Sequence, residues 1–475
     1  MTKTKNRSSS ELVRRIWALC HILRGDGVSY HEYISELTYL LFLKIADETG
    51  TEAALPEGHR WRDLVNYKGP DLLVFYRDML TYLGGHATNP IVQEIYAFPT
   101  TVFSHQENLR AVIAGLAKLD WHSVDADGMG DIYEGLLSRN SQDARSGAGQ
   151  YFTPRSLVDC MVRLTQPELG KVIQDPSCGT GGFLIAAKQF AEERSPEIYA
   201  SNPPRFEGIE IEKGTYRICQ MNSFLHGLDA KLVLGDALTS DVEFLSPADL
   251  VLANPPFGNK SGSARAVRRD LPRRTANKQL AFLQHIRLGL NNGGRAAVVV
   301  PDNVLFESGV GRAIRTDLMD DCDLHTVLRL PNGIFYSQGV NTNVLFFTRR
   351  SGVAENSDRV WVYDMRTSMP RFGKTRPLRP DHFAEFEELY GTDPNGRSPR
   401  SVSSSRERWR SYNRAELAAR DDNLDLVWLA PRENDSDMMD ATAQDFAGAI
   451  LFHLQSAMAE IELLTEELPS DEAAR

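Results

Sequence analysis

An asparagine, two prolines and a phenylalanine follow the apolar run ADLVLA at 248–253, and together they could act on an amine. The side-chain oxygen of Asn254 and the backbone carbonyl of Pro255 could each accept a hydrogen from the exocyclic amine of adenine, which would direct its lone pair toward a methyl donor. Pro255 and Pro256 lack N–H groups and stiffen the loop, and Phe257 could stack on a base that has left its duplex. The pattern predicts a methyl-transfer loop, with a simple proline turn as the structural alternative.

Acidic residues close the neighbouring predicted strands and could hold the methyl donor. The stretch DPSCGTGGFLIAA begins at Asp175, and Gly179 and Gly181 let the chain turn sharply into a helix whose first N–H groups can bind a carboxylate or phosphate. Glu210 after the second strand suits a ribose diol, and Asp236 after the third suits the amino group of adenine. Each acid alone could be a helix cap or a surface charge. Together with the glycine turn they predict a site for S-adenosylmethionine.

The predicted fold must place these residues at one edge of a sheet. Between 171 and about 350, short β-branched runs alternate with helical stretches, which is typical of an α/β fold with a Rossmann-like, doubly wound, mostly parallel sheet. Residues 11–128 instead have apolar residues at three- and four-residue spacing, which indicates helices. We expect an all-α N-terminal domain at 1–130 and a catalytic domain at 131–390. The predicted strands lie in KVIQD, FEGIEI, KLVLGD, ADLVLANP, GRAAVVVP, LHTVLRLP and NTNVLFFTRR.

Composition limits the classes of protein that fit. With 475 residues, of which 42% are hydrophobic and 25% charged, the chain is typical of a soluble protein with more than one domain. Its five cysteines form no CxxC pair, so we expect neither a disulfide framework nor a metal site. No apolar run is long enough to span a bilayer, and we expect a cytoplasmic protein without membrane contact. The formal net charge of -11 repels phosphate, so nucleic-acid binding would need a local basic patch.

A basic stretch directly after the proline loop could provide that patch. Residues 258–278 carry many cations and a single acid, Asp270. Such a stretch could neutralise DNA phosphates beside the active site and make binding dependent on salt. The alternative is a solvated loop that is disordered in the free protein, and the two are compatible if the loop orders on binding. The candidate DNA-binding residues are Lys260, Arg265, Arg268, Arg269, Arg273, Arg274 and Lys278.

The C-terminal region, 391–475, has two predicted parts. Residues 391–405 (GTDPNGRSPRSVSSS) have the composition of a linker that would separate a tail from the sheet. The tail contains one predicted amphipathic helix, which either folds back on its own chain or is offered to a partner subunit. Apolar residues at three- and four-residue spacing predict this helix, which stops at Pro469: Ala447, Leu451, Leu454, Met458, Ile461 and Leu468.

Several motifs together resemble those of a known family. GAGQYFTP at 147–154, DPSCGTGGFL, GIE, GD, NPPF, the stretch at 281–306 and GVNTNVLFF at 339–347 are similar to the modification subunit of type I restriction-modification systems, an N6-adenine DNA methyltransferase family. The resemblance extends from about residue 11 to residue 468. It implies the class I S-adenosylmethionine-dependent methyltransferase fold and N6-methyladenine in DNA as the product. It also implies a separate specificity subunit that binds two modification subunits, with a restriction subunit as a further candidate partner.

The resemblance also assigns roles to individual residues. It implies that the QYFTP motif lies over the methionine part of the cofactor and that Asp175 with the glycine turn holds its amino acid portion. Glu210 would bind the ribose, Asp236 the adenine, and residues 254–257 would be catalytic. Cys178 departs from the alanine that is frequent in the family, but its small side chain should be tolerated. The implied cofactor-binding set is Gln150, Tyr151, Phe152, Thr153, Pro154, Asp175, Ser177, Gly179, Thr180, Gly181, Glu210 and Asp236.

Other functions stay open from the residues alone. The chain could be a self-sufficient DNA methyltransferase that reads its site with residues 351–475. It could instead methylate RNA or a protein glutamine amide, since NPP loops serve those acceptors as well. A non-catalytic scaffold should carry damaged motifs, and the motifs here are intact. In the type I interpretation, the helix at 441–468 and the N-terminal α-domain are the candidate contacts with the specificity subunit.

Overall fold

The computed structural model describes most of the chain and divides it into two compact units. The helical unit comprises Met1–Phe152, Gly179–Gly181 and Glu210–Asp229, and the sheet unit comprises Thr153–Cys178, Gly182–Ile209 and Ala230–Arg475. The helical unit therefore includes chain segments from well beyond residue 130. The described residues are 2–24, 27–52, 55–119, 121, 126–141, 153–257, 268, 270–335, 341–350, 356–370, 372, 376–400, 407–429, 450, 454 and 458.

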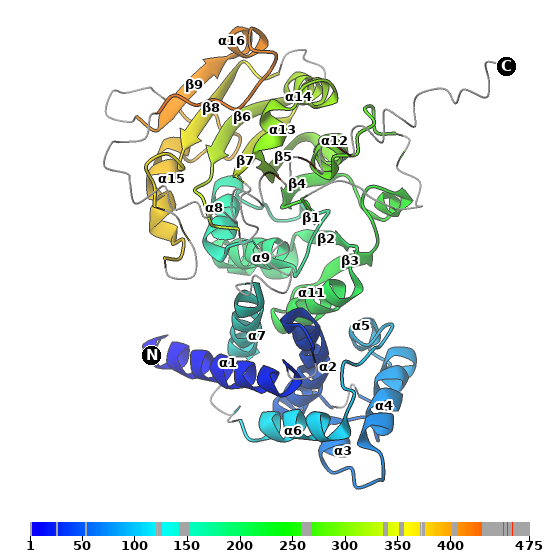
Figure 1. Cartoon of the computed structure of the whole chain (residues 1–475). Coiled ribbons are helices and arrows are strands. Elements are labelled where there is room, and N and C mark those ends of the chain that lie inside the picture. Colours follow the sequence, from blue (N-terminus) through cyan, green and yellow to red (C-terminus); the bar gives the residue numbers. More distant parts are fainter. Residues whose placement is uncertain are drawn as a thin grey trace, which may run out of the picture. The chain divides into compact units, whose positions relative to one another are not determined.

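The helical unit contains the helices predicted for the first 130 residues, together with one helix from later in the chain (Figure 1). They are α1 (Thr2–Arg24), α2 (Tyr30–Thr49), α3 (Trp61–Val65), α4 (Leu72–His86), α5 (Pro90–Ile95), α6 (Gln106–Ala117), α7 (Ala126–Ser141) and α11 (Lys213–Leu225). Ser29 and Glu32 form a capping box at the start of α2, and Gly50 ends that helix with φ 71°. Ile218 and Met221 of α11 lie in the same apolar core as the N-terminal helices. Apolar burial thus joins α11 to this unit.

The described residues form a nine-stranded sheet in the order β3-β2-β1-β4-β5-β7-β6-β8-β9 (Figure 1). The strands are β1 (Val172–Asp175), β2 (Arg205–Glu210), β3 (Ala230–Leu234), β4 (Ala248–Ala253), β5 (Leu290–Pro301), β6 (Cys322–Arg329), β7 (Thr342–Arg349), β8 (Arg359–Asp364) and β9 (Trp409–Asn413). β1 runs parallel to β2 and β4, and β4 runs parallel to β5. β7 lies antiparallel between β5 and β6, and β9 is antiparallel to β8. The sheet is therefore mixed, and it contains every predicted strand together with two that were not predicted, β8 and β9.

Helices cover both faces of the sheet, which makes it doubly wound. α8 and α9 pack on each other and against β4, whereas α12 and α14 pack on each other and against β5 and β6, respectively. Along β5, Ala296, Val298 and Val300 belong to the core under α12 and α14, and the alternation of a strand turns the residues between them to the other face. The remaining helices are α8 (Arg155–Thr165), α9 (Gly182–Arg194), α10 (Pro196–Ser201), η3 (Ser240–Phe244), α12 (Lys278–Gly289), α13 (Asp302–Phe306), α14 (Val310–Asp321), η4 (Pro380–Phe383), α15 (Ala384–Tyr390) and α16 (Arg414–Ala418).

Residues 391–400 differ from the expected linker because they pack against the sheet. The guanidinium of Arg400 lies over the rings of Tyr390 and Trp409, at 4.8 and 5.5 Å from their centroids. It also donates a hydrogen bond to Thr326 Oγ1 in β6 at 2.9 Å. Cation–π and hydrogen-bond contacts hold this segment despite its Gly, Pro and Ser content.

The sheet also continues beyond the expected start of the tail. β9 pairs with β8 from Trp409 to Asn413. Leu417, Leu424 and Leu426 are then buried in the core beneath α12 and α14. Residues 407–429 therefore belong to the sheet unit, and the expectation that the sheet domain ends near residue 390 is wrong.

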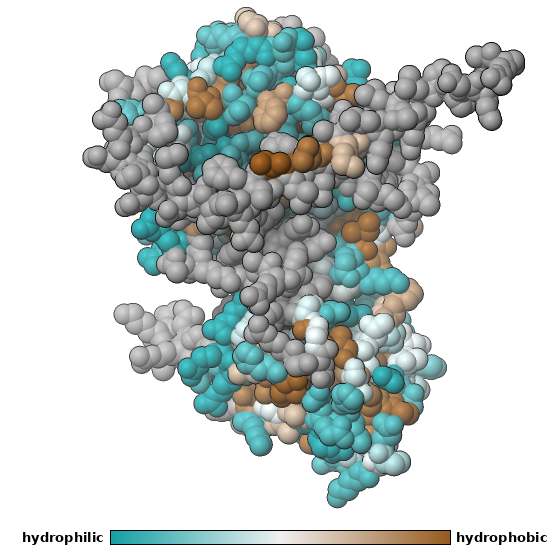
Figure 2. Space-filling model, viewed as in Figure 1, coloured by the Kyte–Doolittle hydropathy of each residue, from teal (hydrophilic) through white to brown (hydrophobic). Residues whose placement is uncertain are grey.

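Most of the predicted C-terminal helix lies outside the described residues. Ile450, Leu454 and Met458 are helical, and their side chains are 59, 57 and 61% exposed. Figure 2 shows hydrophobic residues in small groups among hydrophilic ones on the visible face. In the part of the chain that the structure describes, no helix is long and apolar enough to cross a membrane. The partner role of the C-terminal helix stays a prediction.

Candidate active site

The residues predicted to carry chemistry lie where parallel strands end. Asp175 is the last residue of β1, Glu210 is the last residue of β2, and Asn254 follows β4 directly. Because β1 pairs in parallel with β2 and β4, the carboxyl ends of these strands lie at one edge of the sheet, where open α/β sheets bind ligands. Asp236 follows β3, which is the neighbour of β2 in the strand order. The parallel pairing thus brings the ends of β2, β1 and β4 side by side.

The glycine turn after β1 is fixed by its own backbone and by two polar side chains. Gly179 and Gly181 have φ values of 55° and 83°, a region that residues with a Cβ rarely enter. Glu210 Oε2 accepts a hydrogen bond from the Gly179 N–H at 3.0 Å, and Asn222 of α11 donates to the Thr180 carbonyl at 2.9 Å. The glycines are therefore required by the conformation of the turn, and protein groups hold that conformation.

Glu210 is a buried carboxylate, 4% exposed, that accepts from backbone groups. Oε1 accepts from the Glu212 N–H at 2.8 Å, and Oε2 accepts from Gly179. Burial raises the pKa of Glu210, and the backbone N–H groups of Glu212, Gly179 and Ile211 lower it in part. Each carboxylate oxygen has a second lone pair, so Glu210 can also accept hydrogen bonds from a diol.

Asp175 and Asp236 each hold the loop that follows through Oδ1. Asp175, which is 2% exposed, accepts from the Ser177 N–H at 3.0 Å through Oδ1. Asp236 accepts from the Leu238 N–H at 2.9 Å through Oδ1, and its Oδ2 accepts no hydrogen bond from the described residues. Asp236 thus keeps acceptor capacity for an amino group.

The loop at 254–257 contains a buried acceptor that is not used. Asn254 donates from Nδ2 to Thr153 Oγ1 at 3.1 Å. Its Oδ1 is buried and has no hydrogen-bond partner within the described part of the chain. A buried polar atom left without a partner costs about 1–3 kcal/mol, so such an atom is expected where a ligand supplies the missing hydrogen. The amide is thus arranged to accept a hydrogen from an amine.

Residues far from the motif hold this loop, and their contacts with it were not predicted from the sequence. Gln279 of α12 donates to the Pro256 carbonyl at 2.8 Å. Phe335 packs edge-on against Phe257, with ring centroids 6.1 Å apart. Thr153, expected only as a cofactor contact, bonds to Asn254 across 101 residues of chain. These contacts depend on tertiary packing, and no local motif indicates them.

Two protein families match the chain by sequence. The family described as N-6 DNA Methylase matches residues 124–433, and the HsdM N-terminal domain matches residues 12–55. The first match covers more than half of the chain. The chain belongs to the N-6 DNA methylase family.

The curated proteins that are similar to this chain in sequence include methylase subunits of type I restriction enzymes. The EcoKI methylase subunit of Escherichia coli strain K12 is 42% identical over 98% of this chain and 97% of its own length, and the EcoEI methylase subunit of Escherichia coli is 31% identical over 86% and 89%. The crystal structure of the EcoKI M protein has a TM-score of 0.55 and 38% identity, with 97% of each chain covered. A chain from a structure on complex assembly and conformational transition of the type I R-M system has a TM-score of 0.70 and 26% identity, over 97% of this chain and all of that one. The protein is a type I methylase subunit. It shares its fold with a chain from Listeria monocytogenes described as a class I S-adenosylmethionine-dependent methyltransferase, with a TM-score of 0.51 and 14% identity over 76% of this chain and 93% of that one.

The QYFTP motif of this methylase subunit is only partly described. Thr153 and Pro154 are partly buried, and Pro154 is the residue before α8. The polar groups of the glycine turn act locally, since the Ser177 N–H bonds to Asp175 and the Thr180 carbonyl accepts from Asn222. The motif residues that lie outside the described part are Gln150, Tyr151 and Phe152.

Arg268 differs from the role expected for the basic stretch. Its guanidinium donates to Asp270 at 2.5 Å and bonds to Nδ1 of His285 at 2.7 Å, and its side chain is 10% exposed. Burial and the Arg268 cation lower the pKa of His285 to about 3, so the ring is neutral and accepts this bond. Arg268 therefore anchors the end of the basic stretch, and its contact with DNA stays a prediction.

The other cations of the stretch differ in exposure. Arg273 is half-exposed and pairs with Asp317 at 3.1 Å. Arg274 is exposed, and Lys278 is the partly exposed first residue of α12. These three can still contact DNA, whereas the remaining members of the predicted set lie outside the described residues: Lys260, Arg265 and Arg269.

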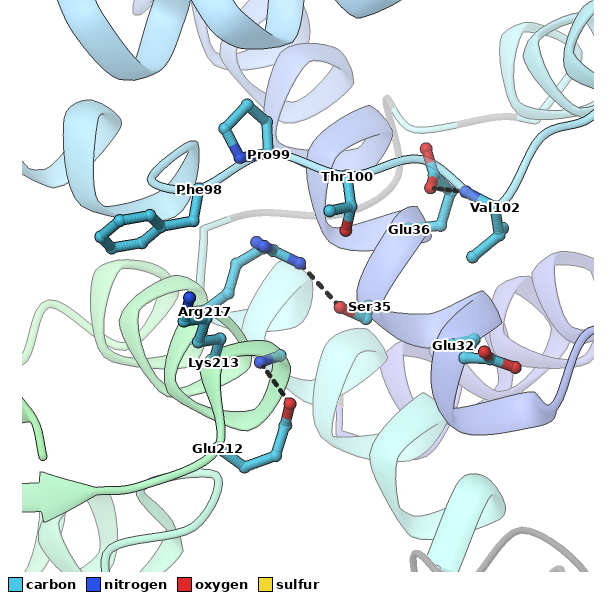
Figure 3. Close-up of a pocket in the computed structure, with 11 residues that line it drawn as sticks. Glu32, Ser35, Glu36, Phe98, Pro99, Thr100, Val102, Glu212, Lys213 and Arg217 are labelled. Atoms are coloured by element: carbon cyan, nitrogen blue, oxygen red, sulfur yellow. Dashed lines mark hydrogen bonds between the residues drawn. The ribbon is translucent and has the colours of Figure 1, made fainter. Parts of the chain in front are cut away.

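The helical unit contains a cavity of about 490 Å³ beside α2 and the start of α11 (Figure 3). Arg217, which is 5% exposed, donates to Ser35 Oγ at 2.8 Å and lies 4.3 Å from the centroid of the Tyr39 ring. Glu212 caps α11 by accepting from two backbone N–H groups. The charged groups of this cavity thus serve to join elements of the unit. No group of metal-ligating side chains occurs in the described part of the chain.

Glu36 is the most buried acid of that cavity. It accepts from the Tyr76 hydroxyl at 2.6 Å and from Thr101 Oγ1 at 3.1 Å. It also accepts from the Val102 N–H at 2.9 Å (Figure 3). Burial raises its pKa to about 6, although these donors lower it. The carboxylate connects α2 to α4 and to the segment at 101–102, which is a structural role.

Proposed function

We propose that this methylase subunit transfers a methyl group from S-adenosylmethionine to the N6 amine of an adenine that is flipped out of DNA. The buried, unpartnered Oδ1 of Asn254 carries the proposal. With the Pro255 carbonyl it can accept both hydrogens of the amine, which makes the nitrogen more tetrahedral and directs its lone pair toward the methyl group. Phe257, supported by Phe335, is placed to stack on the flipped base. Pro255 and Pro256 keep the acceptors in place.

The strand-end carboxylates fit the proposed cofactor. When bound, S-adenosylmethionine supplies an electrophilic methyl group. Glu210 has spare lone pairs for two ribose hydroxyls, Asp236 Oδ2 can accept from the adenine amino group, and Asp175 can accept from the ammonium group of the methionine part. The start of α9 at Gly182 offers N–H groups to the carboxylate. Residues 150–154 are proposed to cover the methionine part.

DNA is the proposed substrate, and a specificity subunit is the proposed partner. The family to which the chain belongs is one of DNA methylases, and Arg273, Arg274 and Lys278 provide cations at and before the start of α12, whose Gln279 contacts the loop. We place sequence recognition in a specificity subunit that binds two copies of this chain, with contacts from the helix at 441–468 and from the helical region 1–130. A restriction subunit is a further proposed partner, and the proposed location is the cytoplasm.

Methylation assays with and without the partner test this proposal. The purified chain is incubated with labelled S-adenosylmethionine and DNA, alone and with the specificity subunit encoded beside it, and ribosomal RNA and protein are offered in parallel. N6-methyladenine that forms in DNA only with the partner supports the proposal. Methylation by the chain alone would favour a self-sufficient enzyme that reads its site with residues 351–475. Label in RNA or in a glutamine amide, and not in DNA, would contradict the proposed substrate.

A further inference from the structure

The contact between Gln279 and the catalytic loop determines which way the side-chain amide of Gln279 is turned. It is 1% exposed and lies in the first turn of α12. Its side-chain nitrogen donates to the Pro256 carbonyl at 2.8 Å. Proline has no N–H, so Pro256 can only accept, and the amide must turn its nitrogen toward the loop. Gln279 Oε1 then faces away and has no partner among the described residues.

A network of buried amides holds Gln279 in this position. Asn277 caps α12, since its Oδ1 accepts from the N–H groups of Gln279 and Leu280 at 3.0 and 3.3 Å. Asn277 Nδ2 donates to Glu307 Oε2 at 2.9 Å, and Asn303 donates to the same oxygen at 3.3 Å. The start of α12 is therefore tied to the carboxylate after α13, and Gln279 extends this rigid network to the loop.

We infer that Gln279 is a positioning residue for methyl transfer, which acts by engaging the second of the two proline carbonyls. The Pro256 carbonyl is occupied by Gln279, whereas the Pro255 carbonyl and Asn254 Oδ1 accept no hydrogen bond from the described residues. The loop thus presents the Pro255 carbonyl and the Asn254 side-chain oxygen to the amine. Because the Pro256 carbonyl is held by Gln279, the orientation of these two acceptors is fixed as well. This inference rests on the proposed function of the loop.

Gln284, on the same helix, provides a matched control. It is 0% exposed, and its amide also bonds to backbone, donating to the Arg273 carbonyl at 3.0 Å and accepting from the Arg273 N–H at 2.9 Å. Both glutamines are buried and stabilise a neighbouring segment, but only Gln279 contacts the loop at 254–257. A general loss of packing should therefore affect both variants, whereas a loss of loop geometry should affect only Gln279.

The experiment compares Gln279→Glu, Gln279→Leu and Gln284→Glu in the complex with the specificity subunit. In Gln279→Glu, the ionised carboxylate cannot donate to the Pro256 carbonyl and repels it, so at neutral pH kcat should fall roughly 10- to 100-fold, while KM for cofactor and DNA stays within about threefold. At lower pH the carboxyl gains a proton and donates again, so kcat relative to wild type should rise. Gln279→Leu should show the same loss without recovery at low pH, and Gln284→Glu should lower the melting temperature but keep kcat within about threefold.

The outcomes separate this inference from the proposed function. Absence of N6-methyladenine with the wild-type complex would contradict the proposed function itself. With an active wild type, an unchanged kcat in both Gln279 variants would overturn the inference. So would an equal loss in Gln284→Glu, or a Gln279→Glu profile that runs parallel to that of Gln279→Leu at every pH. Binding of cofactor by each variant, measured by calorimetry, reports whether the variant is folded.

Discussion

Glu36 in α2 and Glu210 at the end of β2 are both buried glutamates, but they have different roles. They are 3 and 4% exposed, and burial raises the pKa of both. Glu36 accepts from two side-chain hydroxyls and one backbone N–H, which joins three segments of the helical unit. Glu210 accepts only from backbone N–H groups of the loops beside it among the hydrogen bonds of the described residues. Burial and a raised pKa therefore do not identify a functional acid, whereas the kind of donor and the remaining acceptor capacity distinguish the two.

The largest effect is expected at Asn254, a third buried acceptor, because its Oδ1 accepts no hydrogen bond in the described part of the protein. Asn254→Ala should lower kcat at least about 100-fold, since it removes an acceptor that acts in the transition state. Cofactor affinity should stay within about threefold, as measured by calorimetry beside single-turnover methylation. Asp175→Ala should instead weaken cofactor binding. If both variants lose the same cofactor affinity, the loop at 254–257 is structural.

Exchange of each glutamate for glutamine tests the comparison directly. Glu210→Gln removes one charge-assisted bond and places an NH₂ group against a backbone N–H, so the Kd for S-adenosylmethionine should rise roughly 30-fold. Glu36→Gln should leave this Kd unchanged, because among the described contacts Glu36 accepts only from Tyr76, Thr101 and Val102, none of which is a proposed cofactor residue. Calorimetric titration of both variants gives the answer. A larger effect from Glu36→Gln would mean that the junction of α2 with α4 controls cofactor affinity more than Glu210 does.

The pH dependence of stability provides a second test of Glu36. Its pKa is raised from 4.5 to about 6 in the folded chain, so the folded state binds this proton more tightly than the unfolded state does. The resulting stability is present below pH 4.5 and is lost as the pH rises through about 6. The free energy of unfolding of wild type, relative to Glu36→Gln, should therefore fall by about 2 kcal/mol over this range. Urea denaturation at several pH values measures it, and a constant difference would contradict the buried environment of Glu36.

The smallest expected effect concerns the cations near the active site. Arg274→Ala should weaken DNA binding about threefold and reduce the slope of log affinity against log salt by about one. Arg268→Ala should lower thermal stability and leave that slope unchanged, because Asp270 and His285 engage its guanidinium. DNA binding by the complex over a series of salt concentrations distinguishes the two. If Arg268→Ala reduces the salt slope and Arg274→Ala does not, then Arg268 is the residue that contacts phosphate.

The features predicted from the sequence are those that short segments encode. The strand-end acids and Asn254 could be found because each follows an apolar run within one local motif. β9 was missed because WRSYN is half polar, and its partner β8 is far away in the sequence. Gln279 and Phe335 were missed because their roles come from contacts with Pro256 and Phe257 in the folded chain. The contacts of Arg268 were missed because charge counting does not reveal a buried histidine that accepts from it.

The position of β9 has a practical consequence for dissecting the protein. A truncation at residue 391, chosen to remove the C-terminal helix, would also delete β9 and leave the backbone of β8 unpaired on one side. It would remove Leu417, Leu424 and Leu426 from the interior as well. Exposed strand edges promote aggregation, so such a fragment would fail for reasons unrelated to partner binding. A shortened protein intended to report on subunit assembly should therefore keep the chain through residue 429.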